Sequence, residues 1–404
     1  MKELIMESQN LKTLSSLAIK VSKTALNNSE NGVLSGLSGV ALFQISYAKL
    51  MDSQEYYDLG LEKLVKCVEE FGKSYHFNTF CSGLAGVGWT LSHLEEESLI
   101  DQTNSGLYDV IDKYLHELMV SESMKGNYDY LHGSLGHASY FLKRFRLTGK
   151  TKYKLIIEEF LNLLRKISTK DEHGRRWTNF SRGSVIAGQV NLSFSHGMAS
   201  IVRFLTRTFE FKEFDDLSYS LLIESLSYIN TFRNKDITAS IHYPSIIQID
   251  KDDSPRYQSR LAWCYGDLGI GLALLKASEA LSNQRLKELA MNTLINTTSR
   301  RNPNQTGVQD AMLCHGSFGL FEMYNHLFQT TNLKAFKESA DYWFMEGEKF
   351  GVSNNERANF LMWNAEQNRW EDNITILNGL SGIGLSYISR LKNWTSWNEC
   401  LMIN

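Results

Sequence analysis

Residues 36–50 read GLSGVALFQISYAKL, a G-x-x-G signature followed by an apolar run of helical length. The signature recurs along the chain, and each copy precedes another apolar run. Such self-similarity indicates a fold assembled from repeated supersecondary units. The seven copies begin at Gly36, Gly83, Gly133, Gly197, Gly266, Gly316 and Gly379, and in the fourth Ser200 replaces the second glycine.

Each repeat predicts a pair of helices. The runs after the signatures, such as 39–50 and 269–281, are apolar around most of their circumference, which predicts helices buried on most sides. The segments between them, such as 55–71 and 333–350, place apolar residues at i, i+3, i+4 and i+7, which predicts half-buried helices. We therefore expect an all-α fold, an α/α toroid of seven inner and seven outer helices that forms a single domain over residues 1–404.

Two intervals between signatures are longer than the rest. Residues 171–194 and 233–258 contain short β-branched runs beside Gly, Pro and Asp. We expect them to be insertions on the rim of the ring, in the form of loops or a small β-containing extension. Long loops in compact domains often carry function.

Composition excludes several classes of protein. A hydrophobic content of 43% over 404 residues is enough for a large core, and only 3 prolines favours long helices. The net charge of −3 offers no basic excess for nucleic-acid binding. The N-terminus lacks a signal peptide, and the longest apolar stretch, 261–275, is too short to span a membrane. Five widely spaced cysteines favour a reduced compartment, so we expect a cytoplasmic protein.

Positions counted from the first glycine of each repeat bring out a candidate metal site. Cys264 and Cys314 both lie at position −2, and His315 lies at −1. In a toroid, equivalent positions face one central cavity at one depth, and repeats five and six are neighbours. Two thiolates and an imidazole form a zinc site whose fourth position stays open, as in catalytic zinc centres. Cys81 shares position −2 but belongs to repeat two, and we assign it to the wall of the cavity.

Other polar residues occur close to the same positions. His196 is a candidate acid or base at neutral pH. Asp129 is a partner for a His or Arg, or alternatively a helix cap. Arg260 is either a stabiliser of developing negative charge or a surface residue. Tyr265 either donates a hydrogen bond near the metal or packs in the core, whereas His132, His137 and His242 are expected to be structural.

These residues carry a resemblance to a known family. The motifs Ser195-His196-Gly197, Trp263-Cys264-Tyr265-Gly266 and Cys314-His315-Gly316, within seven signatures, resemble the lanthionine synthetase C-like family, whose bacterial members are stand-alone lantibiotic cyclases. The resemblance implies an α/α toroid with one Zn²⁺. It also assigns the site residues: Cys264, Cys314 and His315 as zinc ligands, and His196, Asp129, Arg260 and Tyr265 as catalytic residues.

The resemblance implies a reaction and its partners. A cysteine thiol of a dehydrated precursor peptide with a leader segment adds to dehydroalanine or dehydrobutyrine and forms a lanthionine or methyllanthionine thioether ring. A free thiol is largely protonated at neutral pH, so activation by the metal suits this chemistry. A separate dehydratase and an export transporter are the implied partners, with peripheral association at the inner membrane face through that complex.

Three alternatives stay open at this point. A non-catalytic member of the same family would bind glutathione, another thiol or a peptide without forming a ring. A prenyltransferase-like zinc enzyme would use an Asp-Cys-His set and a basic diphosphate pocket, but the residues above are Cys-Cys-His. A toroidal glycosidase would need two facing carboxylates, for which only Asp129 and Asp267 are candidates.

Overall fold

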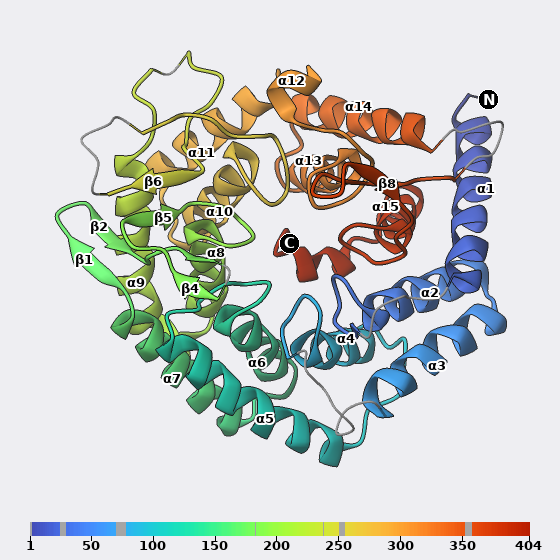
Figure 1. The fold of residues 1–404 in the computed structure, drawn as a ribbon, viewed down its shortest axis with the longest axis horizontal. Coiled ribbons are helices and arrows are strands. Elements are labelled where there is room, and N and C mark those ends of the chain that lie inside the picture. The colour runs from blue at the N-terminus through green and yellow to red at the C-terminus, as the bar shows by residue number, and fades with distance from the viewer. Residues whose placement is uncertain are drawn as a thin grey trace. The chain divides into compact units, whose positions relative to one another are not determined.

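The computed structural model describes residues 2–24, 30–69, 78–181, 183–236, 238–249, 255–351 and 358–404. Contacts within the chain define two compact units. Figure 1 labels the helices and strands along the chain. The central unit is Asp109–Gly307, and the terminal unit combines Met1–Tyr108 with Val308–Asn404.

The terminal unit contains four of the inner helices that follow G-x-x-G signatures. Outer helices pack against them, with α2 against α3 and α13 against α14. A short hairpin of β7 and β8 precedes the last inner helix, and the 3-10 turn η2 (Ser396–Leu401) follows it. The inner helices are α2 (Leu37–Met51), α4 (Leu84–Glu96), α13 (Ser317–Thr331) and α15 (Leu380–Lys392), and the outer ones are α1 (Lys2–Lys23), α3 (Gln54–Glu69) and α14 (Lys334–Phe350).

The central unit contains the other three inner helices and their outer partners. Helix α5 begins in the terminal unit and continues into this one. The inner helices are α6 (Ser134–Thr148), α8 (Met198–Phe209) and α10 (Asp267–Ala280), and the outer ones are α5 (Ser105–Met124), α7 (Thr151–Lys166), α9 (Asp215–Thr231) and α11 (Gln284–Thr297). The short elements η1 (Lys212–Phe214) and α12 (Pro303–Thr306) complete the helices.

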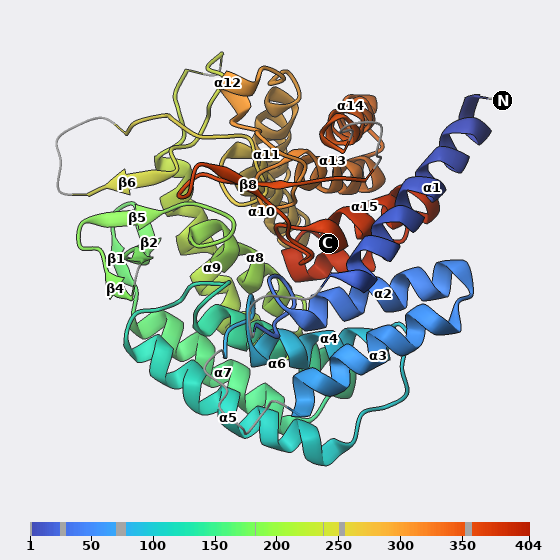
Figure 2. The ribbon, with the colours of Figure 1, turned by 45° about the vertical axis from the view of Figure 1, so that its right-hand side comes forward.

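The strands of the central unit form two-stranded antiparallel ladders beside α9 (Figure 2). Strand β1 pairs with β2, β3 with β4, and β5 with β6. The last pair joins the two predicted insertions, because β5 belongs to 171–194 and β6 to 233–258. The strands are β1 (Thr169–Asp171), β2 (Gly174–Arg176), β3 (Phe180–Ser181), β4 (Ser184–Val185), β5 (Gln189–Asn191) and β6 (Ile246–Gln248).

The predicted helices are confirmed, and small β elements occur where the sequence favoured them. The part of the insertions at 182, 237 and 250–254 lies outside the described residues, as do residues 70 and 71 of the helix predicted at 55–71. The hairpin of β7 (Met362–Asn364) and β8 (Arg369–Glu371) was not predicted. Its strands are three residues long, too short for an alternating pattern to be recognised.

The two glycines of each signature serve different steric needs. The first is the N-cap of the inner helix, and only at Gly266 does it adopt a positive φ, of 104°. The second lies in the first turn, and at Gly39, Gly86, Gly319 and Gly382 it faces a carbonyl of the preceding loop. A Cβ at Gly39 would lie 1.9 Å from the Val33 oxygen, and one at Gly319 equally close to the Leu313 oxygen. The signature therefore lets each inner helix begin tightly against its own loop.

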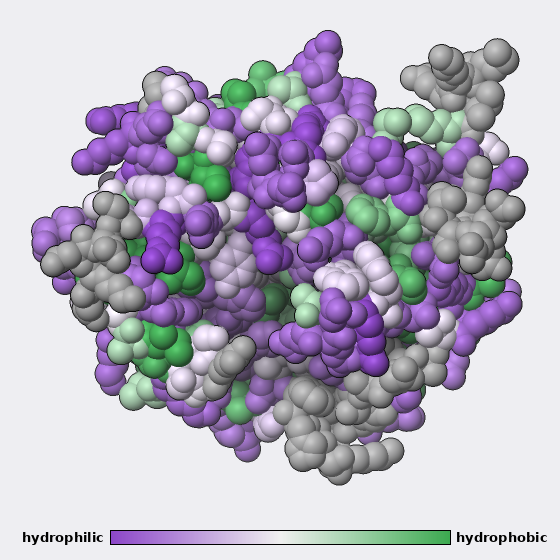
Figure 3. Space-filling model, turned by 45° about the horizontal axis from the view of Figure 1, so that its top comes forward, coloured by the Kyte–Doolittle hydropathy of each residue, from purple (hydrophilic) through white to green (hydrophobic). Residues whose placement is uncertain are grey.

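Among the described residues, no helix combines the length and the apolar character that crossing a bilayer requires. The face drawn in Figure 3 is mostly hydrophilic, and its hydrophobic residues form small separate patches.

Candidate active site

The site is built on the loops that precede the inner helices of the central unit. An Asn or Asp six residues before the first glycine shapes several of these loops. The Asn191 Oδ1 atom accepts a hydrogen bond from the Ser193 backbone N–H at 2.8 Å, and Asp310 and Asn373 accept the equivalent bond from Met312 and Thr375 in the terminal unit. Such Asx turns fix a short loop without regular secondary structure. The sequence analysis missed this recurrence, which was visible at position −6.

In two repeats, the backbone carbonyl at position −2, two residues before the first glycine, accepts two hydrogen bonds from the loop of another repeat. The Cys264 carbonyl accepts from the N–H groups of Phe194 and Ser195 at 3.0 and 3.2 Å. The Leu377 carbonyl accepts from those of Leu313 and Cys314 at 3.1 and 3.0 Å. Each loop is thus tied to the next at the same two positions. Cys264 is the acceptor in its pair of loops, and Cys314 is one of the donors in the other pair.

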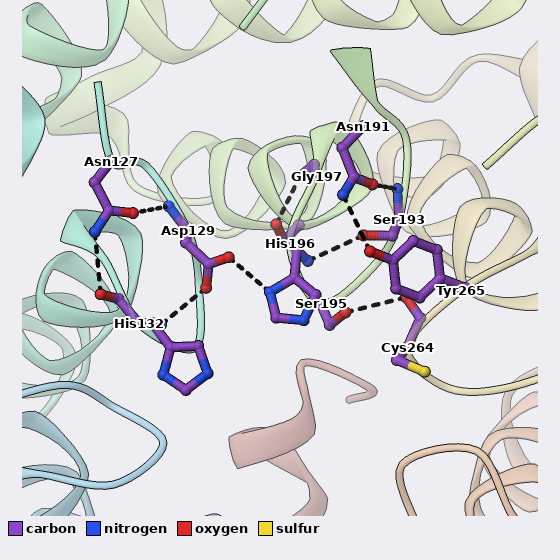
Figure 4. A network of polar contacts seen from close by, with 11 residues as sticks. Asn127, Asp129, His132, Asn191, Ser193, Ser195, His196, Gly197, Cys264 and Tyr265 are labelled. Atoms are coloured by element: carbon purple, nitrogen blue, oxygen red, sulfur yellow. Dashed lines mark hydrogen bonds and ion pairs between the residues drawn. The ribbon is translucent and has the colours of Figure 1, made fainter. Parts of the chain in front are cut away.

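Asp129 and His196 form an ion pair across two of these loops (Figure 4). The Nδ1 atom of His196 lies 2.6 Å from Oδ2 of Asp129. The other carboxylate oxygen of Asp129 accepts the His132 backbone N–H at 2.8 Å. The backbone N–H of His196 donates to the Ser193 hydroxyl at 3.1 Å. Both oxygens of the carboxylate are engaged, so the imidazole is held in one orientation, with Nε2 remaining for other partners.

The pair favours its charged form. Burial raises the pKa of Asp129, but the charge and hydrogen bond of His196 and the nearby His132 outweigh it, and the pKa is lowered. Burial lowers the pKa of His196, but the charge and hydrogen bond of the Asp129 carboxylate raise it overall. The buried carboxylate therefore stabilises a protonated imidazole, the form that donates a proton.

Tyr265 lies beside this pair. Its ring centroid is 6.2 Å from that of His196, and its hydroxyl oxygen accepts a hydrogen bond from the Asn191 side chain at 3.2 Å. Burial raises the pKa of Tyr265, so the phenol stays protonated. The Ser193 side chain also hydrogen-bonds the Tyr265 hydroxyl, so two neighbours hold the phenol in place.

Asp129, His196 and Tyr265 line a single pocket of about 660 Å³ within the central unit. The predicted catalytic residues on these three loops are thus brought together. His132, which the sequence analysis expected to be structural, also lines the pocket, with its ring 6.1 Å from that of His196. The rest of the wall comes from Glu122, Lys125, Asn127, Asn179, Phe180, Ser181, Gly183, Asn191 and Ile246.

The remaining predicted site residues lie as follows. Cys264 is buried at the start of α10 in the central unit, directly before Tyr265. Cys314 and His315 are half-buried at the start of α13 in the terminal unit. Arg260 is exposed and is not among the residues that line the pocket of about 660 Å³. None of the five cysteines forms a disulfide.

The other two histidines weighed in the sequence analysis are core residues. His137 is fully buried in α6. His242 is also buried, and its backbone N–H donates to the Asp267 carboxylate at 2.8 Å. That carboxylate also accepts from the Tyr243 backbone N–H at 2.9 Å, so Asp267 is occupied in tying its loop to α10.

Comparisons with known proteins address the family and the fold of this chain. The sequence model of the lanthionine synthetase C-like protein family matches residues 28–402. Nisin biosynthesis protein NisC of Lactococcus lactis subsp. lactis is 25% identical over 393 residues, which cover 91% of this chain and 88% of NisC. A solved structure of nisin cyclase has a TM-score of 0.76 at 20% identity and covers 98% of this chain and 97% of its own. The likeness to that structure confirms the predicted fold class, a helical α/α toroid.

Proposed function

Because the chain belongs to the lanthionine synthetase C-like family, we propose that it is a zinc-dependent peptide cyclase that forms lanthionine or methyllanthionine rings. The observation that carries the proposal is the Asp129–His196 pair, which lies in one pocket with Tyr265, the residue next to Cys264. The relative NisC takes part in nisin biosynthesis, as its name states, and a peptide is the substrate class that we assign to this chain.

The donor set suits zinc. Cys264, Cys314 and His315 provide two thiols and one imidazole, a combination that zinc uses with an open fourth position in catalytic sites. Cys264 and Cys314 share position −2 of their repeats, which supports a common role for the two thiols. Bound there, the metal would lower the pKa of an incoming cysteine thiol and so supply a thiolate at neutral pH.

His196 is assigned the proton transfer. Addition of the thiol to the dehydroamino acid forms a C–S bond, breaks the C=C π bond and places negative charge on the enolate. The α-carbon must then receive a proton. Protonated His196, with Nδ1 held by Asp129, offers its Nε2–H for that step, and the imidazole can regain its proton from solvent.

Two further residues are assigned to the developing negative charge. Asn191 and Ser193 hold the Tyr265 hydroxyl at the pocket, where it would donate to an oxyanion of the bound substrate. Arg260 would supply a positive charge to the same group, as the family resemblance suggests, although it is exposed in this structure. A dehydratase that supplies the substrate and a transporter that exports the product are the expected partners.

The test uses a synthetic peptide that carries one dehydroalanine and one cysteine. Incubation with the protein and zinc should remove the free thiol, as counted by alkylation, without changing the mass of the peptide, since addition is an isomerisation. A reaction without protein measures the uncatalysed rate. With a thiol-binding protein that has no cyclase activity, the free thiol would disappear only at the uncatalysed rate. This result would reject the proposal.

A further inference from the structure

A cluster of three side chains of the kinds that bind metals lies in the terminal unit, and the proposed chemistry does not use it. It consists of His93 and Glu96 near the end of α4 and Glu399 in η2. One ligand atom of each side chain lies within 4.8 Å of those of the other two. Two ligands bonded to one ion at about 2.1–2.2 Å lie up to about 4.4 Å apart, so at most a small adjustment would bring all three to one ion.

Helix α4 presents two of the three ligands. His93 and Glu96 are three residues apart, so their side chains project from the same face of the helix. The imidazole of His93 is 2% exposed and stacks on the ring of Trp89, with the centroids 4.8 Å apart and an angle of 8° between the planes. This stacking holds the plane of the imidazole in one orientation.

The C-terminal segment supplies the third ligand, Glu399. Residues 400–403 are each fully buried, and the Trp397 Nε1–H donates to a serine hydroxyl of α15 at 3.0 Å. The Trp394 Nε1–H donates to the Glu97 carboxylate at 3.4 Å, which ties this segment to the end of α4 (Figure 2). The packing of the segment therefore places Glu399 beside α4, and the ligand set is preformed.

The charges at the end of α4 favour a cation. Three consecutive glutamates, Glu95–Glu97, occupy its last turn and its C-cap, where the helix macrodipole disfavours carboxylates. Glu399 adds a carboxylate that is 8% exposed, and buried carboxylates in proteins are paired or bind a metal. Lys49 is the basic residue directed to this segment, with its Nζ 4.5 Å from the centroid of the Trp394 ring. A divalent cation at the C-terminal end of α4 would offset the remaining negative charge.

From these features we propose that His93, Glu96 and Glu399 bind a divalent transition-metal ion that links η2 to α4. The imidazole favours such an ion over Mg²⁺ and Ca²⁺, which take oxygen ligands, and the two carboxylates suit Mn²⁺ better than a thiolate set does. Because Glu96 is exposed and three ligands leave the other positions to water, the ion should exchange with solvent. The site would then fill from added metal rather than keep its ion through purification. The inference is independent of the proposed function, since the two share no residue.

The test is a titration of the full chain with Mn²⁺, in which electron paramagnetic resonance measures the ion that stays free in solution. The protein should bind about one Mn²⁺, and the variant that combines Cys264→Ala with Cys314→Ala should bind it equally well. In that variant an equimolar amount of Zn²⁺ should displace Mn²⁺, because zinc binds a given set of nitrogen and oxygen ligands more tightly, whereas equimolar Mg²⁺ should not. Pulsed measurements should show the nitrogen coupling of a bound imidazole, and His93→Gln should remove it.

A matched pair of variants locates the site. Glu96→Gln should weaken Mn²⁺ binding by at least about tenfold, because the loss of a direct ligand costs no less than the loss of an outer-shell partner. Glu97→Gln makes the same change one residue later and keeps an acceptor for Trp394, so it should bind Mn²⁺ like the parent protein. Glu399→Gln should behave like Glu96→Gln. Binding that survives in Glu96→Gln, or that Glu97→Gln weakens equally, would overturn the proposal.

The metal should also stabilise the fold. Mn²⁺ at about a hundred times its dissociation constant should raise Tm by about 3–6 °C in the parent protein and leave Tm unchanged in Glu96→Gln. If the parent protein binds no Mn²⁺ at millimolar concentration, the three side chains form only a hydrogen-bonded group, and the proposal is overturned. Mn²⁺ binding that depends on Glu96, without ring formation in the peptide assay, would support this site while the cyclase proposal failed. Ring formation by a protein that binds no Mn²⁺ would do the reverse.

Discussion

The Nδ1 atom of His196 lies 2.6 Å from Oδ2 of Asp129, although the two residues are 67 positions apart and come from the loops of different repeats. Because the carboxylate is buried, it acts on the imidazole at a low effective dielectric constant. The first prediction follows from the direction in which each residue shifts the pKa of the other.

Asp129→Asn should move the pH dependence of ring formation. If protonated His196 donates the proton, activity falls as the pH rises through its pKa, which Asp129 raises. Removal of the carboxylate lowers that pKa, so the fall should occur at lower pH and the maximal rate should drop about 10- to 100-fold. The control is Glu159→Gln, which removes the partner of His116 from an exposed pair with the same 2.6 Å separation. An unchanged profile in Asp129→Asn would remove His196 from proton transfer.

Asn191→Ala should slow the reaction beyond its effect on stability. The substitution removes the bond to the Tyr265 hydroxyl as well as the Asx turn. We expect about a tenfold loss in kcat and a loss of about 1–2 kcal/mol in the free energy of unfolding. Asn373→Ala is the matched control, since Asn373 has the equivalent turn in the terminal unit. Equal rates for the two variants would show that Asn191 has only a structural role.

Gly266→Ala should distort the loop that carries Cys264 and Tyr265. Gly266 has a φ of 104°, and a Cβ there would lie 2.1 Å from the Arg260 oxygen. We expect a loss of about 2–4 kcal/mol in chemical denaturation, together with a loss of activity. Gly149→Ala isolates the clash, because Gly149 also has a positive φ, of 61°, but its Cβ would meet nothing within 4 Å. If both variants lose equal stability, the contact between a Cβ at position 266 and the Arg260 oxygen does not contribute to the loss.

Glu322→Gln should stabilise the protein at neutral pH. Burial raises the pKa of Glu322 from 4.5 to about 8. Since the folded-state pKa is raised, the stability is fully present below the unfolded pKa and is lost as the pH rises through about 8. At pH 7 the cost is about 3 kcal/mol, which a neutral Gln avoids.

Unfolding of Glu322→Gln by urea should therefore show a gain over the parent protein that vanishes towards pH 4 and increases up to pH 8. Glu338→Gln, at an exposed position on α14, should show no such trend. A gain independent of pH would indicate that packing rather than titration is responsible.

The sequence predicted the helices well because each has a distinct pattern. The apolar runs after the signatures and the i, i+3, i+4 spacing of segments such as 333–350 can both be recognised in a single sequence. The structure of the loops was harder to predict from the sequence. The −6 turn at Asn191 depends on local hydrogen bonds, and strand β6 depends on pairing with β5 over 50 residues away.

The candidate site was predicted in part for the same reason. Counting positions from each glycine placed His196 and Tyr265 on comparable loops, and the structure brings both to the Asp129 pocket. The sequence left the partner of Asp129 open between a His and an Arg, because the direction of a side chain in a loop depends on tertiary packing, and the structure shows His196. His132 was underestimated because position −1 alone does not distinguish a wall residue from a core residue.

The zinc content of purified protein is the most direct test of the account. Cys264→Ala and Cys314→Ala should each lower the bound zinc from about one equivalent to near zero and abolish ring formation. Cys81→Ala, which alters the same −2 position in repeat two, should retain both. Zinc retained in Cys264→Ala and Cys314→Ala, or lost equally in Cys81→Ala, would contradict the proposed centre.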